Sequence, residues 1–319
     1  MNFELLLSNL TNPTLLFFLL GIIASLIKSD LEIPASSFKF ISLYLLFSIG
    51  FKGGQELAHS HIDNEVIFSL VFGFILAALI PLYTFFILKR KLDIWNSGAI
   101  AASYGSVSAV TFVAASSFLE FLGISFGGHM VAVMALMEFP AIIVGVLLIM
   151  RHDKSENGNI SLKDTLRHSV SNGSVLMIMG SLIIGYISNG KQAMEIKPFT
   201  TDIFKGFLAI FLLEMGITTA KRFSAFRNNG WFVVFFSIFI PLINGCVIAF
   251  LSAFVTHDVG NRFIFSILAA SASYIAVPAA MRLVAPKADP GLYIPMALGL
   301  TFPFNITIGM PIYYYLITM

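Results

Sequence analysis

The sequence of 319 residues has few charges and almost no cysteine: 11% of its residues are charged, and Cys246 is the one thiol. A single cysteine excludes a disulfide framework and a cysteine-based metal motif, and its apolar neighbours in the sequence indicate a small packing residue. The six histidines lack the i, i+4 spacing of zinc-binding helices. The net charge of +2 is too small to favour nucleic acid as a partner.

The sequence also lacks the usual signatures of catalysis. No Ser-His, paired-Asp or HExxH arrangement occurs at usable spacing within its apolar runs. We therefore expect neither an enzyme nor an organic cofactor. The first residues, MNFELLLSNLTNP, lack the basic start of a cleaved signal peptide, so the first apolar run is predicted to be a retained membrane span.

Apolar residues, by contrast, are abundant: 57% of the sequence is hydrophobic and its mean hydropathy is +0.89. Such a composition indicates that the bilayer is the main solvent, with no room for a separate soluble domain. Stretches such as residues 67–88 are apolar on every face, whereas a membrane barrel needs alternating segments of about 10 residues. The sequence therefore predicts an all-α polytopic membrane protein.

The chain is predicted to cross the bilayer ten times, because each span needs roughly 20 mostly apolar residues and charged or turn residues separate the runs. Only the fifth connection, residues 151–172, is longer than a short loop. The predicted spans are residues 13–28, 37–56, 66–88, 95–118, 128–150, 173–189, 201–219, 231–256, 261–283 and 291–318.

The orientation follows from the positive-inside rule, because cytoplasmic connections retain Lys and Arg. Most of the 19 Lys and Arg residues fall in odd-numbered connections of the predicted topology. The two termini are therefore predicted to lie on the non-cytoplasmic side, and the loop at residues 151–172 is predicted to be cytoplasmic.

Three pairs of segments repeat in the same order in the two halves of the chain. They are FSIGFKGG (47–54) with LEMGITTA (213–220), AASYGSVSAV (101–110) with AASASYIAV (269–277), and MALMEFPAIIVG (134–145) with MALGLTFPFNITIG (296–309). We interpret residues 1–150 and 173–319 as two five-span repeats. Since five is odd, the second repeat is inverted, an arrangement that places substrate and ion near the bilayer midplane.

Spans four and nine are predicted to be broken helices. Gly105, Ser106 and Ser108 interrupt the first, and Ser271 and Ser273 interrupt the second before Pro278. Unwound backbone would expose N–H groups that bind an anion, helped by helix dipoles, while hydroxyl and carbonyl oxygens suit a hard cation such as sodium. The alternative is that Gly and Ser only allow close helix packing.

Glu138 lies near the middle of span five, where a carboxylate is costly unless it is paired, protonated or bound to a metal ion. Pro140 weakens the helix just after it. Span ten offers neutral oxygen donors, Thr301 and Asn305, near the equivalent place. The alternative is a protonated Glu138 hydrogen-bonded between helices.

Lys52, with Glu56, is predicted either to line the permeation path or to reach interfacial water.

At these motifs the sequence resembles the sodium-dependent bicarbonate transporter family. The matching segments are NPTLLFFLLG, LLFSIGFKGG, YGSVSAVTFVAA, MEFPAIIVG, FLLEMGITTAKRF and SYIAVPAAMRLVAPKADPGLY, which together extend over nearly the whole chain. The resemblance implies two inverted five-span halves, a core domain that moves against a gate domain, a homotrimer, and sodium-coupled uptake of a small anion in a bacterial inner membrane.

The resemblance, together with the oxygen donors noted above, indicates which residues form the site. The predicted anion-binding residues are Gly105, Ser106, Val107, Ser108, Ser273, Tyr274 and Ile275. The predicted sodium ligands are Ser103, Ser108, Thr111, Glu138, Ser271 and Asn305. One departure from the family is Tyr274, which stands where the family's symporter carries Asp. A second is the short loop at residues 151–172, which argues against the docking of a regulatory partner there.

We therefore expect a sodium-coupled symporter of a small anion, with bicarbonate as the leading substrate. The scarcity of Arg within the spans agrees with this, because a bulky dicarboxylate would require a membrane-embedded cation. Two alternatives stay open at this stage: a transporter of larger organic anions, similar to the bile-acid symporters, and an uncoupled channel or membrane sensor.

Overall fold

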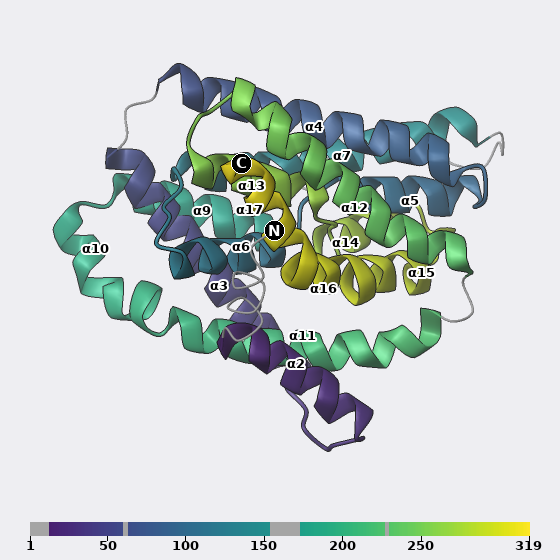
Figure 1. Ribbon diagram of the computed structural model, residues 1–319, viewed down its shortest axis with the longest axis horizontal. Coiled ribbons are helices and arrows are strands. Elements are labelled where there is room, and N and C mark those ends of the chain that lie inside the picture. Colours follow the sequence, from purple (N-terminus) through teal and green to yellow (C-terminus); the bar gives the residue numbers. More distant parts are fainter. Residues whose placement is uncertain (1–12, 60–62, 154–172, 227–229) are drawn as a thin grey trace.

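The computed structural model describes residues 13–59, 63–153, 173–226 and 230–319, and every regular element within these ranges is a helix (Figure 1). Most of the predicted cytoplasmic loop, residues 154–172, lies outside the described residues. Six helical segments are long and apolar enough to cross a membrane: Asn64–Leu88, Ile94–Phe121, His129–His152, Gly190–Lys221, Trp231–Phe254 and Pro290–Thr318. The all-helical membrane architecture expected from the sequence is confirmed.

The described residues of the first half form six helices, and acidic caps begin two of them. The Asp63 side chain accepts a hydrogen bond from the Val66 backbone at 3.1 Å, and Asp93 accepts one from Asn96 at 2.9 Å, which satisfies N–H groups that a helix start leaves free. The helices are α2 (Pro13–Leu26), α3 (Ala35–His59), α4 (Asn64–Leu88), α5 (Ile94–Gly105), α6 (Ala109–Phe121) and α7 (His129–His152).

The second half contains the same kinds of helix with more interruptions. Its elements are α9 (Gly173–Ile187), α10 (Gly190–Lys197), the π-helical turn η1 (Pro198–Asp202), α11 (Phe204–Phe226), α12 (Trp231–Leu251), the 3-10 turn η2 (Ser252–Phe254), α13 (Val259–Ala270), α14 (Ala276–Val284), α15 (Pro290–Pro295), η3 (Met296–Thr301), α16 (Phe302–Phe304), η4 (Asn305–Gly309) and α17 (Met310–Thr318).

Two local expectations from the sequence differ from the structure. Residues 190–197, expected in a connection, form α10, because Asn189 and Gln192 build a capping box and no helix breaker follows before Pro198. Helix α7 continues as an α-helix through Pro140, where the sequence predicted a weakened turn. The equivalent distortion is found instead in the last span, as the π-helical turns η3 and η4 near Pro295 and Pro303.

Helices from the two halves pack in crossed pairs. Helix α2 packs along α11, and α3 packs along α9. Glycines allow both contacts: a Cβ atom at Gly21 would overlap the carbonyl oxygen of Leu213, and one at Gly185 would overlap that of Phe51. Without those Cβ atoms the backbones can approach closely, the usual way that membrane helices associate.

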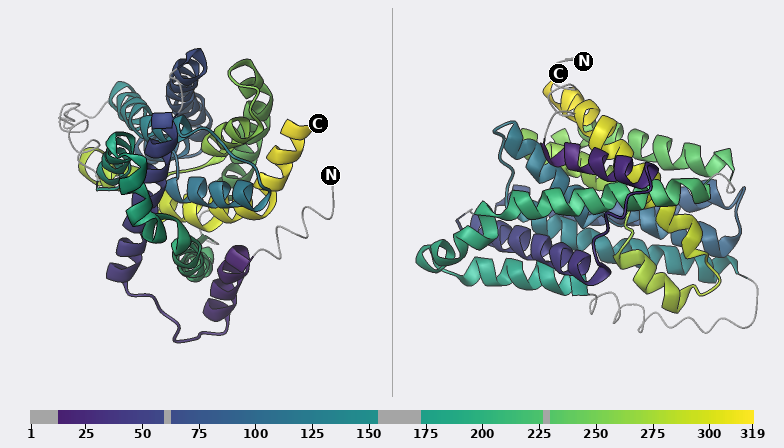
Figure 2. Two further views of the ribbon diagram at one scale, coloured as in Figure 1. Left: turned by 90° about the vertical axis from the view of Figure 1, so that its left-hand side faces the viewer. Right: turned by 90° about the horizontal axis from the view of Figure 1, so that it is seen from below.

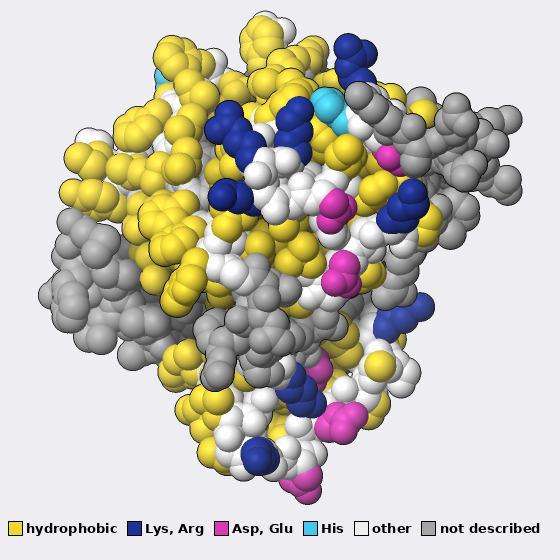
Figure 3. Space-filling model, turned by 90° about the vertical axis from the view of Figure 1, so that its right-hand side faces the viewer, with side chains coloured by type: hydrophobic (Ala, Val, Ile, Leu, Met, Phe, Trp, Pro, Cys, Tyr) yellow, Lys and Arg dark blue, Asp and Glu magenta, His cyan; other side chains and the backbone are white. Residues whose placement is uncertain are grey.

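The other spans form a second group. Helix α4 packs against α5 and α7, and α12 packs against α13 and α17. Figures 1 and 2 place α4 and α12 on the side of the bundle opposite α2 and α11. Both α4 and α12 expose large apolar side chains, including Phe68, Phe74, Phe235 and Phe239, as expected of helices that face lipid. Figure 3 shows one end of the bundle, where Lys and Arg side chains lie among hydrophobic ones.

Candidate functional site

Two helix breaks meet inside the bundle. Helix α5 ends at Gly105, Ser106 has extended backbone (φ −84°, ψ 161°), and α6 begins at Ala109. Helix α13 ends at Ala270, Ser271 is extended in the same way (φ −83°, ψ 168°), and α14 begins at Ala276. The breaks lie where Gly and Ser replace bulky apolar residues, because those residues remove the side-chain packing that would stabilise a continuous helix.

Hydrogen bonds fix the two breaks to each other. The Ser273 N–H donates to the Ser103 carbonyl at 2.8 Å, and the Ser103 hydroxyl donates to the Ser273 carbonyl at 2.5 Å. The Ser108 N–H donates to the Ser271 hydroxyl at 3.1 Å. Backbone groups that leave the helical pattern inside a membrane need such partners, so each break satisfies polar groups of the other.

The N-termini of α6 and α14 converge on one small cavity. The Ser108 hydroxyl caps α6 by accepting from the Thr111 N–H at 3.1 Å, but the first N–H groups of any α-helix have no partner within that helix. Ala109 and Ala276, the first residues of α6 and α14, both line the cavity. Two positive helix ends therefore face one space, a geometry that favours an anion.

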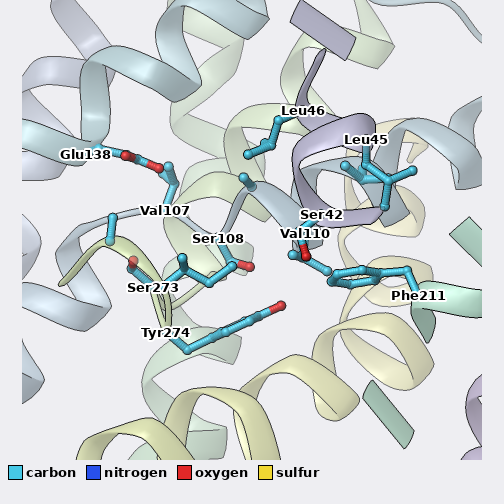
Figure 4. Close-up of a pocket in the computed structure, with 14 residues that line it drawn as sticks. Ser42, Leu45, Leu46, Val107, Ser108, Val110, Glu138, Phe211, Ser273 and Tyr274 are labelled. Atoms are coloured by element: carbon cyan, nitrogen blue, oxygen red, sulfur yellow. The ribbon is translucent and has the colours of Figure 1, made fainter. Parts of the chain in front are cut away.

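This cavity has a volume of about 20 Å³, enough for one water molecule or small ion. Figure 4 shows that Glu138 approaches it from one side, near Val107, while the Tyr274 ring lies on another. Its full lining consists of Ser42, Leu45, Leu46, Val107, Ser108, Ala109, Val110, Val113, Glu138, Phe211, Ser273, Tyr274, Ile275 and Ala276.

Glu138 supplies the one carboxyl group among the residues that line this cavity. Its side chain is 5% exposed, and Oε2 is buried without a hydrogen-bond partner among the described residues. A buried carboxylate oxygen without a protein partner is costly. The oxygen is therefore suited to a cation or to a proton.

The structure brings some of the predicted site residues together and separates others. Of the predicted anion-binding residues, Val107, Ser108, Ser273, Tyr274 and Ile275 line the cavity, but Gly105 and Ser106 do not. A Cβ atom at Gly105 would overlap the Pro81 ring, so that glycine allows α5 to pack against α4.

Among the predicted sodium ligands, only Ser108 and Glu138 line the cavity; Ser103, Thr111, Ser271 and Asn305 lie outside it. Ser103 and Ser271 make the hydrogen bonds that join the two breaks. Asn305 donates to the Ala270 carbonyl at 2.7 Å and accepts from the Tyr313 hydroxyl at 3.2 Å, which ties the last span to the end of α13.

Sequence reasoning missed the wall that α3 and α11 contribute. Ser42 lies on α3 and Phe211 on α11, and both line the cavity. Each is one ordinary residue in a long apolar run, so no local signal distinguishes it from its neighbours. Among the described residues, no group of three or more His, Cys, Asp or Glu side chains is placed to hold a metal ion.

Comparison with known proteins gives one match over almost the whole chain. A family model described as the Na+-dependent bicarbonate transporter superfamily matches residues 13–318. No curated protein matches the sequence. The matched region includes both helix breaks, Glu138 and the cavity wall from α3 and α11.

Proposed function

The chain belongs to the Na+-dependent bicarbonate transporter superfamily, and on this premise we propose that it is a secondary transporter that couples sodium to the uptake of a small anion, with bicarbonate as the leading substrate. The observation that carries the proposal is the convergence of two helix N-termini and one unpartnered carboxylate oxygen on a single buried cavity.

In this mechanism the N-terminal backbone groups of α6 and α14 bind the anion. The hydroxyls of Ser108 and Ser273 supply further hydrogen-bond partners. Bicarbonate carries one negative charge and both accepts and donates hydrogen bonds, so N–H groups and hydroxyls are enough to recognise it. A buried Arg is not needed.

Sodium is proposed to bind beside the anion on Glu138. The Oε2 atom of Glu138 has no partner among the side chains and backbone that the structure describes, and sodium prefers oxygen ligands, as other hard cations do. The sodium ion and the bicarbonate ion carry opposite charges, so each lowers the cost of placing the other in a membrane interior. This gives a physical reason for coupling, since each ion stabilises the other.

The size of the cavity favours a small anion over a larger organic one. Pockets for drug-sized ligands have volumes of about 300–1,000 Å³, whereas the volume here is about 20 Å³. An anion such as a bile acid would require a large opening of the wall formed by α3 and α11. A bicarbonate ion requires a much smaller displacement.

We propose that residues 1–150 and 173–319 are inverted repeats that together supply ten spans. The cross-packing supports this: the first described helix of each half, α2 or α9, packs on a helix of the other half, α11 or α3. A second support is a pair of matching contacts. Asn96 accepts from the Asp289 N–H at 2.8 Å, and Asn261 accepts from the Gly127 N–H at 2.7 Å.

Alternating access follows from the same grouping. Helices α2, α3, α9 and α11 would form the gate, and the remaining spans would form the core that carries the broken helices. Because the cavity is lined by both groups, a movement of one against the other exposes the ions first to one side and then to the other. The termini are proposed to be non-cytoplasmic in a bacterial inner membrane.

The decisive experiment is uptake of labelled bicarbonate into proteoliposomes with and without an inward sodium gradient. The proposal expects saturable uptake that collapses when potassium replaces sodium. Unsaturable flux without a sodium requirement would instead indicate a channel. Strong inhibition by bile acids would favour the organic-anion alternative. A homotrimer, which the resemblance implies, is tested separately by the mass of the detergent-solubilised protein.

A further inference from the structure

A second, larger cavity lies between α3, the C-terminal end of α6 and the start of α11. Its volume is about 330 Å³, more than ten times that of the cavity beside Glu138. Its polar lining residues are Lys52 and Glu56 of α3, Ser116, Ser117 and Glu120 of α6, and Ser125 of the following loop. In the proposed topology this is the non-cytoplasmic side, where substrate arrives.

Lys52 is the cation of this cavity; it interacts electrostatically with Glu56, one helical turn away, but makes no close ion pair with any carboxylate in the described part of the chain. No carboxylate lies within 4.0 Å of its ammonium group; its recorded contact is the Phe204 ring, with Nζ 5.6 Å from the ring centroid. Lys52 is partly buried. An aromatic face stabilises a half-buried ammonium group only weakly, so this group is placed to attract an anion.

Each carboxylate of the cavity has a cation beside it. Glu120 forms an ion pair with Lys205, whose Nζ lies 3.0 Å from the Glu120 carboxylate, and both side chains are more than half exposed. Glu56 is exposed at the end of α3, one helical turn from Lys52, and interacts with it electrostatically. An anion that enters the cavity would contact the Lys52 ammonium in competition with Glu56.

Lys52 is also a difference between the two halves of the chain. Aligning FSIGFKGG (47–54) with LEMGITTA (213–220) pairs Lys52 with Thr218. Thr218 donates a hydrogen bond to Glu214 at 3.0 Å within its own helix. Since the second half builds the same helix without a cation, packing alone does not require Lys52.

We propose that this cavity is an outer capture site, in which Lys52 binds the small hydrated anion before it reaches the broken helices. The inference rests on the proposed function for its direction of transport. The cavity is too large to hold a bare bicarbonate ion tightly, so it concentrates the anion through charge, with hydroxyls of Ser116 and Ser117 at the wall. Such electrostatic concentration accelerates association more than it raises final affinity.

The first test is bicarbonate uptake by Lys52→Met in proteoliposomes. We expect KM for bicarbonate to rise about tenfold, the low end of electrostatic concentration effects, with the maximal rate within about twofold and the sodium dependence unchanged. Lys52→Arg should keep the wild-type KM. The matched control is Lys191→Met, which removes an exposed lysine of α10. A wild-type KM in Lys52→Met would overturn the proposal.

A second test restores the charge chemically. The one cysteine, Cys246, is replaced in Cys246→Ser, and Lys52→Cys is added. An aminoethyl methanethiosulfonate reagent, which regenerates a cation, should return KM toward the wild-type value, while a sulfonatoethyl reagent should not. Equal effects of the two reagents would mean that the charge at this position is not what the transporter uses.

A third test measures binding without transport. In the Cys246→Ser background, a thiol reagent labels Ser116→Cys, and bicarbonate should slow this labelling when Lys52 is present but not in Lys52→Met. Protection by bicarbonate without any sodium-driven uptake would support the capture site and reject the proposed function. Sodium-driven uptake without protection would support the proposed function and reject the capture site.

Discussion

Ser103 and Ser273 are joined by two hydrogen bonds that run in opposite directions between the halves of the protein. The Ser273 N–H donates to the Ser103 carbonyl at 2.8 Å, and the Ser103 hydroxyl donates to the Ser273 carbonyl at 2.5 Å. This pair places the two helix breaks in contact and sets the distance between the starts of α6 and α14. The anion site is therefore a property of both halves.

Ser103→Ala should weaken this connection. It removes the hydroxyl bond and leaves the Ser273 carbonyl with one buried donor fewer, at a cost of about 1 kcal/mol. We expect a lower unfolding temperature and about a fivefold rise in KM for bicarbonate. Ser266→Ala is the control, because its hydroxyl bonds to the Arg262 carbonyl within α13; an equal rise in KM there would contradict the role of Ser103.

Glu138→Gln tests the sodium ligand. The change keeps the shape of the side chain but removes its charge, and a bond to a charged group contributes about 1.5–3 kcal/mol. The sodium concentration for half-maximal uptake should therefore rise about tenfold or more. Glu195→Gln, an exposed position in α10, is the control. Unchanged sodium dependence would remove Glu138 from the ligands.

Ala276→Leu should fill the small cavity. The larger side chain occupies space between the two helix ends, so bicarbonate uptake should fall to background, while the overpacking destabilises the fold by about 1–3 kcal/mol. Uptake and thermal unfolding are measured together. Ala58→Leu, at an exposed position near the end of α3, should leave both unchanged. Normal uptake by Ala276→Leu would mean that the anion binds elsewhere.

Gly105→Val should act differently from a cavity-filling variant. Because a Cβ at Gly105 would overlap Pro81, the expected effect is loss of folded protein, seen as a lower yield of monodisperse protein in detergent. Any protein that folds should bind bicarbonate with nearly normal KM. A stable variant that has lost only anion binding would place Gly105 at the site after all.

Asn96→Ala and Asn261→Ala test the matching contacts of the two halves. Each loses one bond to the loop before the partner span, at about 1 kcal/mol. Asn261→Ala should be the more destabilising, because its second bond, to the Glu65 carboxylate at 3.0 Å, is partly buried, whereas the second bond of Asn96, to the Asp93 carboxylate at 2.6 Å, is exposed. Thermal unfolding of the two variants and of the double variant measures this. The effects should add, since the two sites share no partners.

Much of the fold could be predicted from the sequence because its signals are local. Apolar runs and the Gly and Ser residues at 105–108 and 271–273 depend on neighbours along the chain, and the structure breaks both helices there. The Asp-x-x-Asn caps at Asp93 and Asp258 were not predicted, because only the structure shows that Asn96 and Asn261 each bond a neighbouring loop.

The small cavity beside Glu138 could not be predicted, because it is formed by contacts between segments that are distant in the sequence. Ser103 and Ser273 are 170 residues apart, and Ser42 and Phe211 reach the cavity from mainly apolar stretches of two other helices, α3 and α11. Composition determined that the chain folds as helices in a bilayer, because unpaired backbone is too costly in lipid. Only tertiary packing decided which helix ends face Glu138, because side-chain contacts between distant segments depend on how whole helices cross.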